Sequence, residues 1–174
     1  MQIVNDGDAH VLALKETYVR KSGVSKFGAA VNLSLGTSVG FGVLDRDGNL
    51  LHTCQGHNWE IGNLRIDTRE KNKDLCWALG SEGLKSLEDK KEVADPYVHY
   101  GHRLCTFLGG MLAPVFHPRI IGLSGGIVAG HREKIKEGIQ RECEYRNYPA
   151  LCNVEIYLSP NKDSVMLGLS ALLN

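Results

Sequence analysis

The stretch Ala30-Val-Asn-Leu-Ser-Leu-Gly-Thr-Ser-Val-Gly-Phe-Gly-Val-Leu44 decides how the rest of the chain is arranged. Two runs rich in Val, Leu and Phe flank Gly36-Thr37-Ser38, which predicts a strand, a tight glycine turn and a second strand. Such a turn can bind an anion such as phosphate, because a backbone without Cβ atoms can bring its N–H groups and the Thr37 and Ser38 hydroxyls close to it. A plain β-hairpin whose glycines relieve crowding explains the same residues, and the stretch alone favours that simpler interpretation.

Length and composition predict one domain over residues 1–174, or one lobe of a larger enzyme. Apolar residues make up 43% of the chain, and 20 basic residues balance 20 acidic ones. A net charge of zero therefore does not indicate binding to nucleic acid or to an anionic membrane. No apolar run approaches membrane-spanning length, and the first residues lack the basic and apolar regions of a signal peptide. We expect a cytoplasmic protein.

The five cysteines are odd in number and widely spread along the chain. This pattern suits reduced thiols in the cytosol better than a disulfide framework. We expect Cys105, Cys143 and Cys152 to be small buried apolar residues.

Hydrophobic periodicity predicts an α/β chain. The expected helices cover about 7–20, 74–91 with interruptions at Gly80 and Gly83, 95–114, 130–143 and 163–173. The expected strands cover about 27–35, 39–45 and 49–54, as an antiparallel meander, followed by buried strands at 119–123 and 154–158. This order is typical of a ribonuclease-H-like layer, a mixed sheet with helices on both faces.

Five short segments occur in one order along the chain. They are Val4-Asn5-Asp6-Gly7-Asp8-Ala9, Gly36-Thr37-Ser38-Val39-Gly40, Trp59-Glu60-Ile61-Gly62-Asn63, Leu123-Ser124-Gly125-Gly126-Ile127, and the tail from Val154 through Gly168-Leu169-Ser170-Ala171. Together they resemble the motifs of the ROK family (repressor, open reading frame, kinase), sugar kinases with the actin-like ATPase fold. The resemblance covers most of the chain but only the second half of the family's length, so we expect a C-terminal lobe whose N-terminal partner has no counterpart here.

The resemblance implies a role for each motif. Asp6 would be the general base that takes a proton from a sugar hydroxyl as it attacks the γ-phosphate of ATP with Mg²⁺. The implied sugar-binding residues are Asn5, Glu60 and Asn63, and the implied nucleotide-binding residues are Gly36, Thr37, Ser38, Gly125 and Gly126. From local sequence alone, Asp6 could instead cap a helix and Glu60 could be merely solvated.

The family's zinc site, which the resemblance would bring with it, is incomplete. Its histidine is Asn63 here, and of its three cysteines only Cys76 is present. One ligand of four cannot hold zinc, so we expect no structural zinc, and the sugar contact at position 63 is in doubt. Two other pairs, Cys54-x-x-His57 and His99-x-x-His102, are interpreted as unrelated residues.

Two functions follow from the resemblance. The first is ATP-dependent phosphorylation of a hexose or an N-acetylhexosamine, incomplete in this chain because the first phosphate motif is missing. The second is a non-catalytic sugar- or nucleotide-binding domain descended from such a kinase. The DNA-binding repressors of the family fit less well, because the net charge is zero and no helix-turn-helix segment precedes the first motif. We expect a small sugar and ATP as partners, neither nucleic acid nor membrane, and a homodimer, since a lone lobe exposes its partner face.

Overall fold

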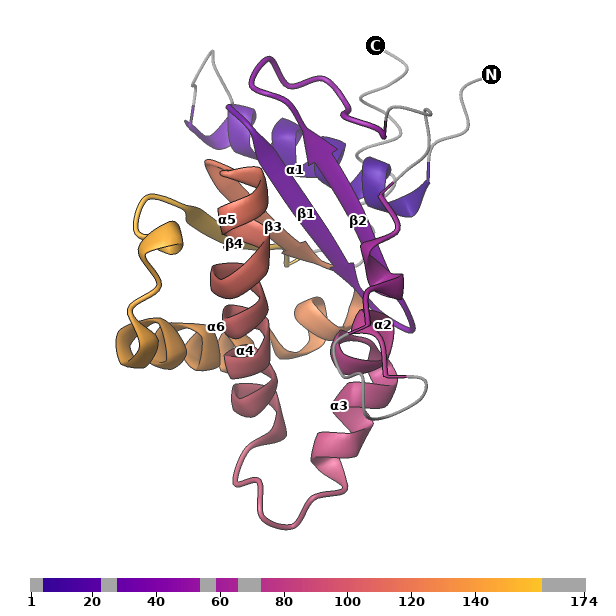
Figure 1. Cartoon of the computed structure of the whole chain (residues 1–174), viewed down its shortest axis with the longest axis vertical. Coiled ribbons are helices and arrows are strands. Elements are labelled where there is room, and N and C mark those ends of the chain that lie inside the picture. Colours follow the sequence, from indigo (N-terminus) through magenta and orange to yellow (C-terminus); the bar gives the residue numbers. More distant parts are fainter. Residues whose placement is uncertain (1–4, 23–27, 54–58, 66–72, 161–174) are drawn as a thin grey trace.

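A mixed four-stranded sheet forms the centre of the chain (Figure 1). The computed structural model describes residues 5–22, 28–53, 59–65 and 73–160. The strands are β1 Ala30–Leu35, β2 Val39–Leu44, β3 Ile120–Ser124 and β4 Glu155–Leu158, in the order β2-β1-β3-β4. Strand β1 pairs antiparallel with β2 and parallel with β3, and β3 pairs parallel with β4. The first glycine stretch is therefore strand, turn and strand, as predicted.

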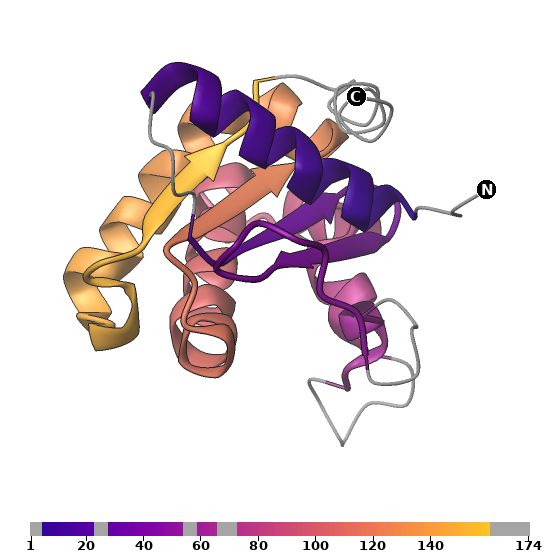
Figure 2. The same ribbon diagram turned by 90° about the horizontal axis from the view of Figure 1, so that it is seen from above.

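Helices cover both faces of this sheet. Figure 2 shows the indigo helix α1, Asp6–Ser22, lying across one face, with the helices of the second half of the chain beneath the other. That second layer consists of α2 Leu75–Leu79, α3 Ser81–Glu88, α4 Pro96–Phe107, η2 Leu108–Leu112, α5 Ala113–Phe116 and α6 Gly126–Arg146. Short 3₁₀ turns, η1 Ile61–Asn63 and η3 Pro149–Leu151, complete the described elements. The layered α/β arrangement predicted from periodicity is confirmed.

Helices α1 and α4 begin at side-chain caps that the sequence supplies. The Asn5 side chain accepts a hydrogen bond from the Asp8 amide at 2.8 Å, which satisfies an N–H group at the start of α1. Asp95 accepts from the Tyr97 and Val98 amides at the start of α4, and Pro96 occupies the first helical position. The hydrogen bonds that the Asp95 carboxylate accepts from Lys134 and from the Val98 and Tyr97 amides lower its pKa.

Two apolar cores lie on the two faces of the sheet. The smaller one joins α1 to the sheet through residues such as Val11, Leu14 and Ile120. The larger one fills the space between the sheet and the second helical layer, and Tyr100 lies fully buried inside it. The Tyr100 hydroxyl donates a hydrogen bond to the Leu79 carbonyl, and burial raises the pKa of this tyrosine. The apolar residues of the first half of α1, namely Ala9, Val11, Leu12, Ala13 and Leu14, are all buried.

Four expectations for the elements are wrong. Residues 49–53 form no strand, only one antiparallel bridge between Leu50 and Leu44. Gly83 lies inside α3 and does not interrupt it. Helix α6 begins at Gly126 instead of position 130. Strand β4 is an edge strand, and none of its four residues is fully buried.

The helix predicted to end near Pro114 continues to Phe116 and changes its winding on the way. Residues Leu108–Leu112 form a π-helical turn between α4 and α5. The apolar spacing of a regular α-helix would place Met111 on the same inward face as Leu104 and Leu108. With the wider turn, Met111 instead lies at the surface, where 36% of it is exposed. The predicted closing helix 163–173 and the end of the expected strand at Cys54 lie outside the described residues.

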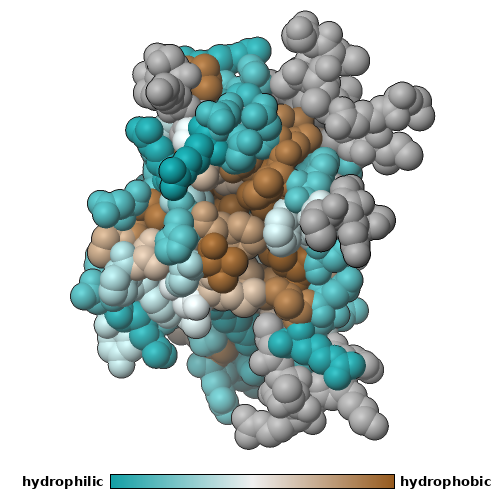
Figure 3. Space-filling view, turned by 45° about the horizontal axis from the view of Figure 1, so that its top comes forward, coloured by the Kyte–Doolittle hydropathy of each residue, from teal (hydrophilic) through white to brown (hydrophobic). Residues whose placement is uncertain are grey.

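Apolar side chains also reach the surface. Figure 3 shows a brown apolar area in the middle of one face, bordered by teal polar side chains. Val115 is 64% exposed and Leu64 is 40% exposed, and both border a wholly apolar groove together with Trp59, Phe107 and Met111. Among the helices in the described ranges, none combines the length and the apolar character needed to cross a lipid bilayer.

Candidate functional site

The two glycine turns predicted to bind a nucleotide lie next to each other. Strands β1 and β3 are parallel neighbours, so their carboxyl ends meet at one edge of the sheet. Strand β1 continues into Gly36-Thr37-Ser38, and β3 continues into Gly125 and Gly126. A Cβ atom built on Gly125 would lie 2.8 Å from the backbone nitrogen of Leu35, so the second turn rests against the end of β1. Ligands of open α/β sheets bind at such an edge.

The first turn is supported from one side and open on the other. The Gly36 amide donates to the Ser38 carbonyl at 3.1 Å, and the Ser81 amide donates to the Gly36 carbonyl at 2.9 Å. The side chains of Thr37 and Ser38 are exposed, and a Cβ atom on Gly36 would meet no atom within 4 Å. The break between α2 and α3 therefore holds the turn in place while its outer surface stays accessible.

The second turn begins α6, whose backbone is kinked at His131 (φ −135°, ψ 28°). Gly125 has φ +95° and ψ 174°, a conformation that essentially only glycine adopts. It precedes Gly126, the first of the 21 residues of α6, where an added Cβ atom would meet nothing within 4 Å. Unpaired N–H groups and the positive end of the helix dipole make such a helix start attractive to anions.

Asp6 lies at the same edge, on the other face of the sheet. Its side chain is exposed, and its Oδ1 accepts a hydrogen bond from the Gly7 amide at 2.9 Å. A Cβ atom on Gly40 would lie 3.1 Å from Oδ1 of Asp6, so this carboxylate sits over the start of β2. Gly40 pairs with Ser34, near the end of β1. Because Asn5 caps the helix, the capping role considered for Asp6 is carried by its neighbour.

Two glycines hold α1 close to β2. Gly7 packs against the backbone of Phe41, and a Cβ atom on Gly42 would overlap the Gly7 carbonyl and lie 2.8 Å from Cγ1 of Val11. Gly42 therefore has a packing role, whereas Gly36, in the same strand-turn-strand stretch, keeps an open surface that a ligand can approach. This close contact places Asp6 beside the first turn.

The predicted sugar-binding segment lies against the same end of β2. Gly62 of η1 packs on Val39, where an added Cβ atom would lie 3.2 Å from the Val39 carbonyl oxygen. Glu60 and Asn63, on either side of it, have exposed side chains. Asn5 is half-buried, and its side-chain oxygen is engaged with the Asp8 amide. The structure thus brings all the predicted site residues to one edge of the sheet.

A contact between a buried carboxylate and a histidine, next to Asp6, escaped the sequence analysis. The Asp8 carboxylate, 4% exposed, lies 3.0 Å from Nε2 of His52, which is 27% exposed. Asp8 lies on the inward face of α1, three residues before Val11. A carboxylate on an otherwise apolar helix face was the sequence pattern that could have indicated a buried, paired Asp8. The partner could not be found from the sequence, because 44 residues separate the two.

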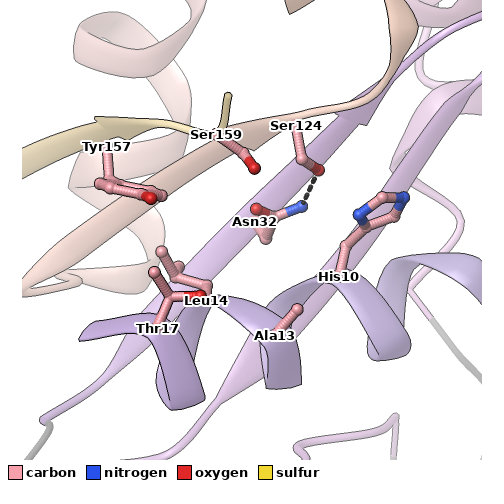
Figure 4. A pocket seen from close by; sticks show the side chains of 8 residues that line it. All are labelled: His10, Ala13, Leu14, Thr17, Asn32, Ser124, Tyr157 and Ser159. Carbon is pink, nitrogen blue, oxygen red and sulfur yellow. Dashed lines mark hydrogen bonds between the residues drawn. The ribbon is translucent and has the colours of Figure 1, made fainter. Parts of the chain in front are cut away.

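A small polar cavity lies between α1 and the sheet, beneath the second turn (Figure 4). His10 and Thr17 reach it from α1, Asn32 from β1, and Ser124 from the end of β3. The Asn32 side-chain nitrogen donates to the Ser124 hydroxyl at 2.9 Å, and that hydroxyl contacts the Leu33 carbonyl oxygen at 3.4 Å. Burial lowers the pKa of His10, and the nearby Asp6 charge partly opposes that shift.

The possible metal ligands do not gather. Over the ranges that the structure describes, no group of three or more His, Cys, Asp or Glu side chains is arranged to hold a metal ion. The sulfur of Cys76 instead lies beneath the start of β2, 3.4 Å from the Val39 amide nitrogen. The rings of His99 and His102 are 6.0 Å apart, and the Cys54-x-x-His57 pair lies outside the described residues.

Three solved structures illustrate what this arrangement is similar to. The ROK hexokinase from Thermus thermophilus superposes with a TM-score of 0.71 at 19% identity, over 97% of this chain and 65% of that one. A ROK family glucokinase from Streptomyces griseus, in complex with glucose and AMPPNP, gives 0.62 at 16% identity, over 98% and 67%. The fold is therefore that of the ROK sugar kinases. A ROK family transcriptional regulator, a homolog of the E. coli MLC protein, gives 0.61 at 18% identity, over 97% and 51%.

The sequence itself is distant from characterised proteins. No family model matches it, and no curated protein sequence does. The chain spans about half to two thirds of the length of the structures named above. The likeness therefore establishes the actin-like, hexokinase-like fold, which was predicted from the sequence.

Proposed function

We propose that the chain is the C-terminal lobe of an ATP-dependent sugar kinase that acts on a hexose or an N-acetylhexosamine. The observation that supports this most is the meeting of Asp6, the Gly36–Ser38 turn and the Gly125–Gly126 turn at one edge of the sheet. A carboxylate beside two anion-attracting backbone turns is what phosphoryl transfer to an alcohol requires. The fold shared with a hexokinase and a glucokinase agrees with it.

The two turns fit a nucleotide. Gly36 and Gly126 leave open space where a side chain would stand, and Thr37 and Ser38 expose hydroxyl donors. The first turn would hold the β- and γ-phosphates through its backbone N–H groups. The resemblance to the ROK motifs implies that the second turn would lie at the adenosine side of the nucleotide. ATP supplies the phosphoryl group, and Mg²⁺ would be bound mainly through the phosphate oxygens.

Asp6 would act as the general base. An exposed carboxylate held by the Gly7 amide can accept a proton from a sugar hydroxyl while the oxygen attacks phosphorus. Asn5, Glu60 and Asn63 would orient the sugar, since amides and carboxylates offer the donors and acceptors that a polyol needs. The buried pair of Asp8 and His52 would fix the first turn of α1 and thereby the direction of Asp6.

The experiment is an ADP-release assay of the full chain with glucose, N-acetylglucosamine and N-acetylmannosamine. Asp6→Asn keeps the size of the side chain and removes the base, so we expect at least a 100-fold loss of turnover. Asp6 is exposed, so the free energy of unfolding should change by less than about 0.5 kcal/mol. The matched control is Asp47→Asn, an exposed substitution in the turn between Asp45 and Asn49, which should retain the parent rate.

Activity of Asp6→Asn close to that of the parent would remove Asp6 from the base role. Absence of turnover in the parent, with AMPPNP or sugar binding intact by calorimetry, would favour the second candidate, a non-catalytic binding domain. Alignment of the reactants depends on both sides of a cleft, so turnover and binding are measured separately. A single domain over residues 1–174, a homodimer and a cytoplasmic location remain predictions.

A further inference from the structure

Helices α4 and α6 cross with their backbones in unusually close contact. Gly101 and Gly138 face each other at the crossing, and a Cβ atom built on Gly138 would lie 3.0 Å from Cα of Gly101. Contacts run in the same order along both helices, from the ion pair of Lys134 with Asp95 at 2.9 Å to a contact of Thr106 with Glu142 at 3.3 Å. Residues one turn beyond the crossing are therefore held face to face.

Two of those residues are cysteines. Cys105 follows Gly101 by four positions on α4, and Cys143 follows Gly138 by five positions on α6. Their sulfur atoms are 3.0 Å apart. Cys105 is fully buried, whereas Cys143 is half-buried and lies next to Glu142 near the surface. All three of Cys105, Cys143 and Cys152 were expected to be buried. Burial is confirmed for Cys105 only, because Cys143 is half-buried and Cys152 is exposed.

We propose that Cys105 and Cys143 are a dithiol site that a small disulfide such as oxidised glutathione converts into a disulfide bond between α4 and α6. Bond formation needs the sulfurs to approach by about 1 Å, within the reach of a side-chain torsion. The site is separate from the proposed kinase function, and nothing in its argument depends on that function.

Accessibility sets the order of the steps. The thiolate of the half-buried Cys143 attacks the oxidised glutathione, forming a mixed disulfide and releasing one reduced glutathione. The thiolate of Cys105 then attacks the Cys143 sulfur and releases the second glutathione as its thiol. Both protein thiols lose a proton and together lose two electrons, and the glutathione disulfide gains both. Burial and the contact with Cys143 raise the pKa of Cys105, so the second step should be slow at neutral pH and faster as pH rises.

The bond would tie together helices whose cysteines are 38 residues apart in sequence. Closing a loop of that length restricts the unfolded chain, so the oxidised protein should melt at a temperature higher by about 5 °C or more. Reduction with dithiothreitol should return the melting temperature to its starting value.

The test incubates the full chain with oxidised glutathione at pH 8, followed by mass spectrometry and thermal melting. We expect a mass lower by about 2 Da, a peptide map linking Cys105 to Cys143, and the melting shift. Cys143→Ser should abolish the linked peptide and the shift, while Cys152→Ser, which removes an exposed thiol, should leave both unchanged.

Several outcomes would overturn the proposal. A Cys143 adduct that keeps its glutathione, a disulfide that involves another cysteine, or full retention of five free thiols would each do so. Because the decisive measurement uses the parent protein, a folding defect in a variant cannot hide the result. Loss of kinase activity in the Asp6→Asn protein would leave this test unaffected.

Discussion

The two glycine turns at the sheet edge look alike in sequence and differ in what they require of their glycines. Gly125 adopts φ +95° and lies against the backbone of Leu35, so the fold itself demands a residue without a Cβ atom. Gly36 has no left-handed backbone, and an added Cβ atom would meet nothing. A glycine that the fold does not need is the better indicator of a ligand, and by this criterion Gly36 and Gly126 are more informative than Gly125.

The largest expected effect is at the second turn. Gly125→Ala should lower the free energy of unfolding by about 3 kcal/mol or more, because the backbone conformation is strained for alanine and the methyl group overlaps Leu35. Urea denaturation measures the change. The neighbouring Gly126→Ala is the control: its methyl group has free space at the start of α6, so stability should stay the same or rise by at most about 1 kcal/mol. Equal effects at both positions would contradict the comparison.

The first turn should respond in the opposite way. Gly36→Ala should change the free energy of unfolding by less than about 0.5 kcal/mol, since the site is open. A methyl group there would keep a phosphate from the backbone N–H groups, so AMPPNP affinity measured by calorimetry should fall about tenfold or more. Unchanged affinity would mean that the turn is only a hairpin, the simpler interpretation that the sequence left open.

The smallest effect concerns the cavity beneath the second turn. His10 is buried, and its pKa is lowered, so the unfolded chain binds a proton more readily than the folded one as pH falls below about 6.5. Stability should therefore decrease between pH 7 and pH 5, and His10→Gln should show a smaller decrease over that interval. Urea unfolding midpoints at pH 7 and pH 5 measure the decrease in stability. Midpoints at pH 8 provide the reference, because His10 is neutral there in both the folded and the unfolded protein. A decrease of the same size in both proteins would remove His10 as its source.

Local patterns were sufficient for much of the fold. The apolar spacing of α1, the Asp95-Pro96 start of α4 and the strand, turn and strand around Gly36 depend on neighbouring residues, and the structure has each of them. Strand β4 was predicted to be buried because its composition is apolar. It is instead the outermost strand of the sheet, beside β3, and that position depends on strand order, which local sequence does not determine. The prediction of a strand at 49–53 was wrong for a related reason. A strand must pair with a neighbour along its whole length, and in this stretch only Leu50 pairs, with Leu44.

The candidate site was predictable only in part. Asp6 and the two turns carry recognisable motifs, and parallel pairing of β1 with β3 then brings them together. The distinction between Gly42, which packs on Gly7, and Gly36, which is open, was not predictable, because both are glycines beside a turn. The pairing of Asp8 with His52 was also hidden, since it joins a helix to a segment far along the chain.

The π-helical turn at Leu108–Leu112 has a consequence for how this helix tolerates changes in length. A regular helix turns by about 100° per residue, so one residue more or less redirects everything that follows it. Here the wide turn accommodates an extra residue, and beyond it Phe116 lies 5.3 Å from Phe41 and 5.5 Å from Trp59, ring centre to ring centre. Deleting one residue from this segment would therefore present a different side chain to Trp59. Because Leu108 and Leu112 belong to the same core as Tyr100, an insertion or deletion there would alter both that core and the residue that supports the segment carrying Glu60.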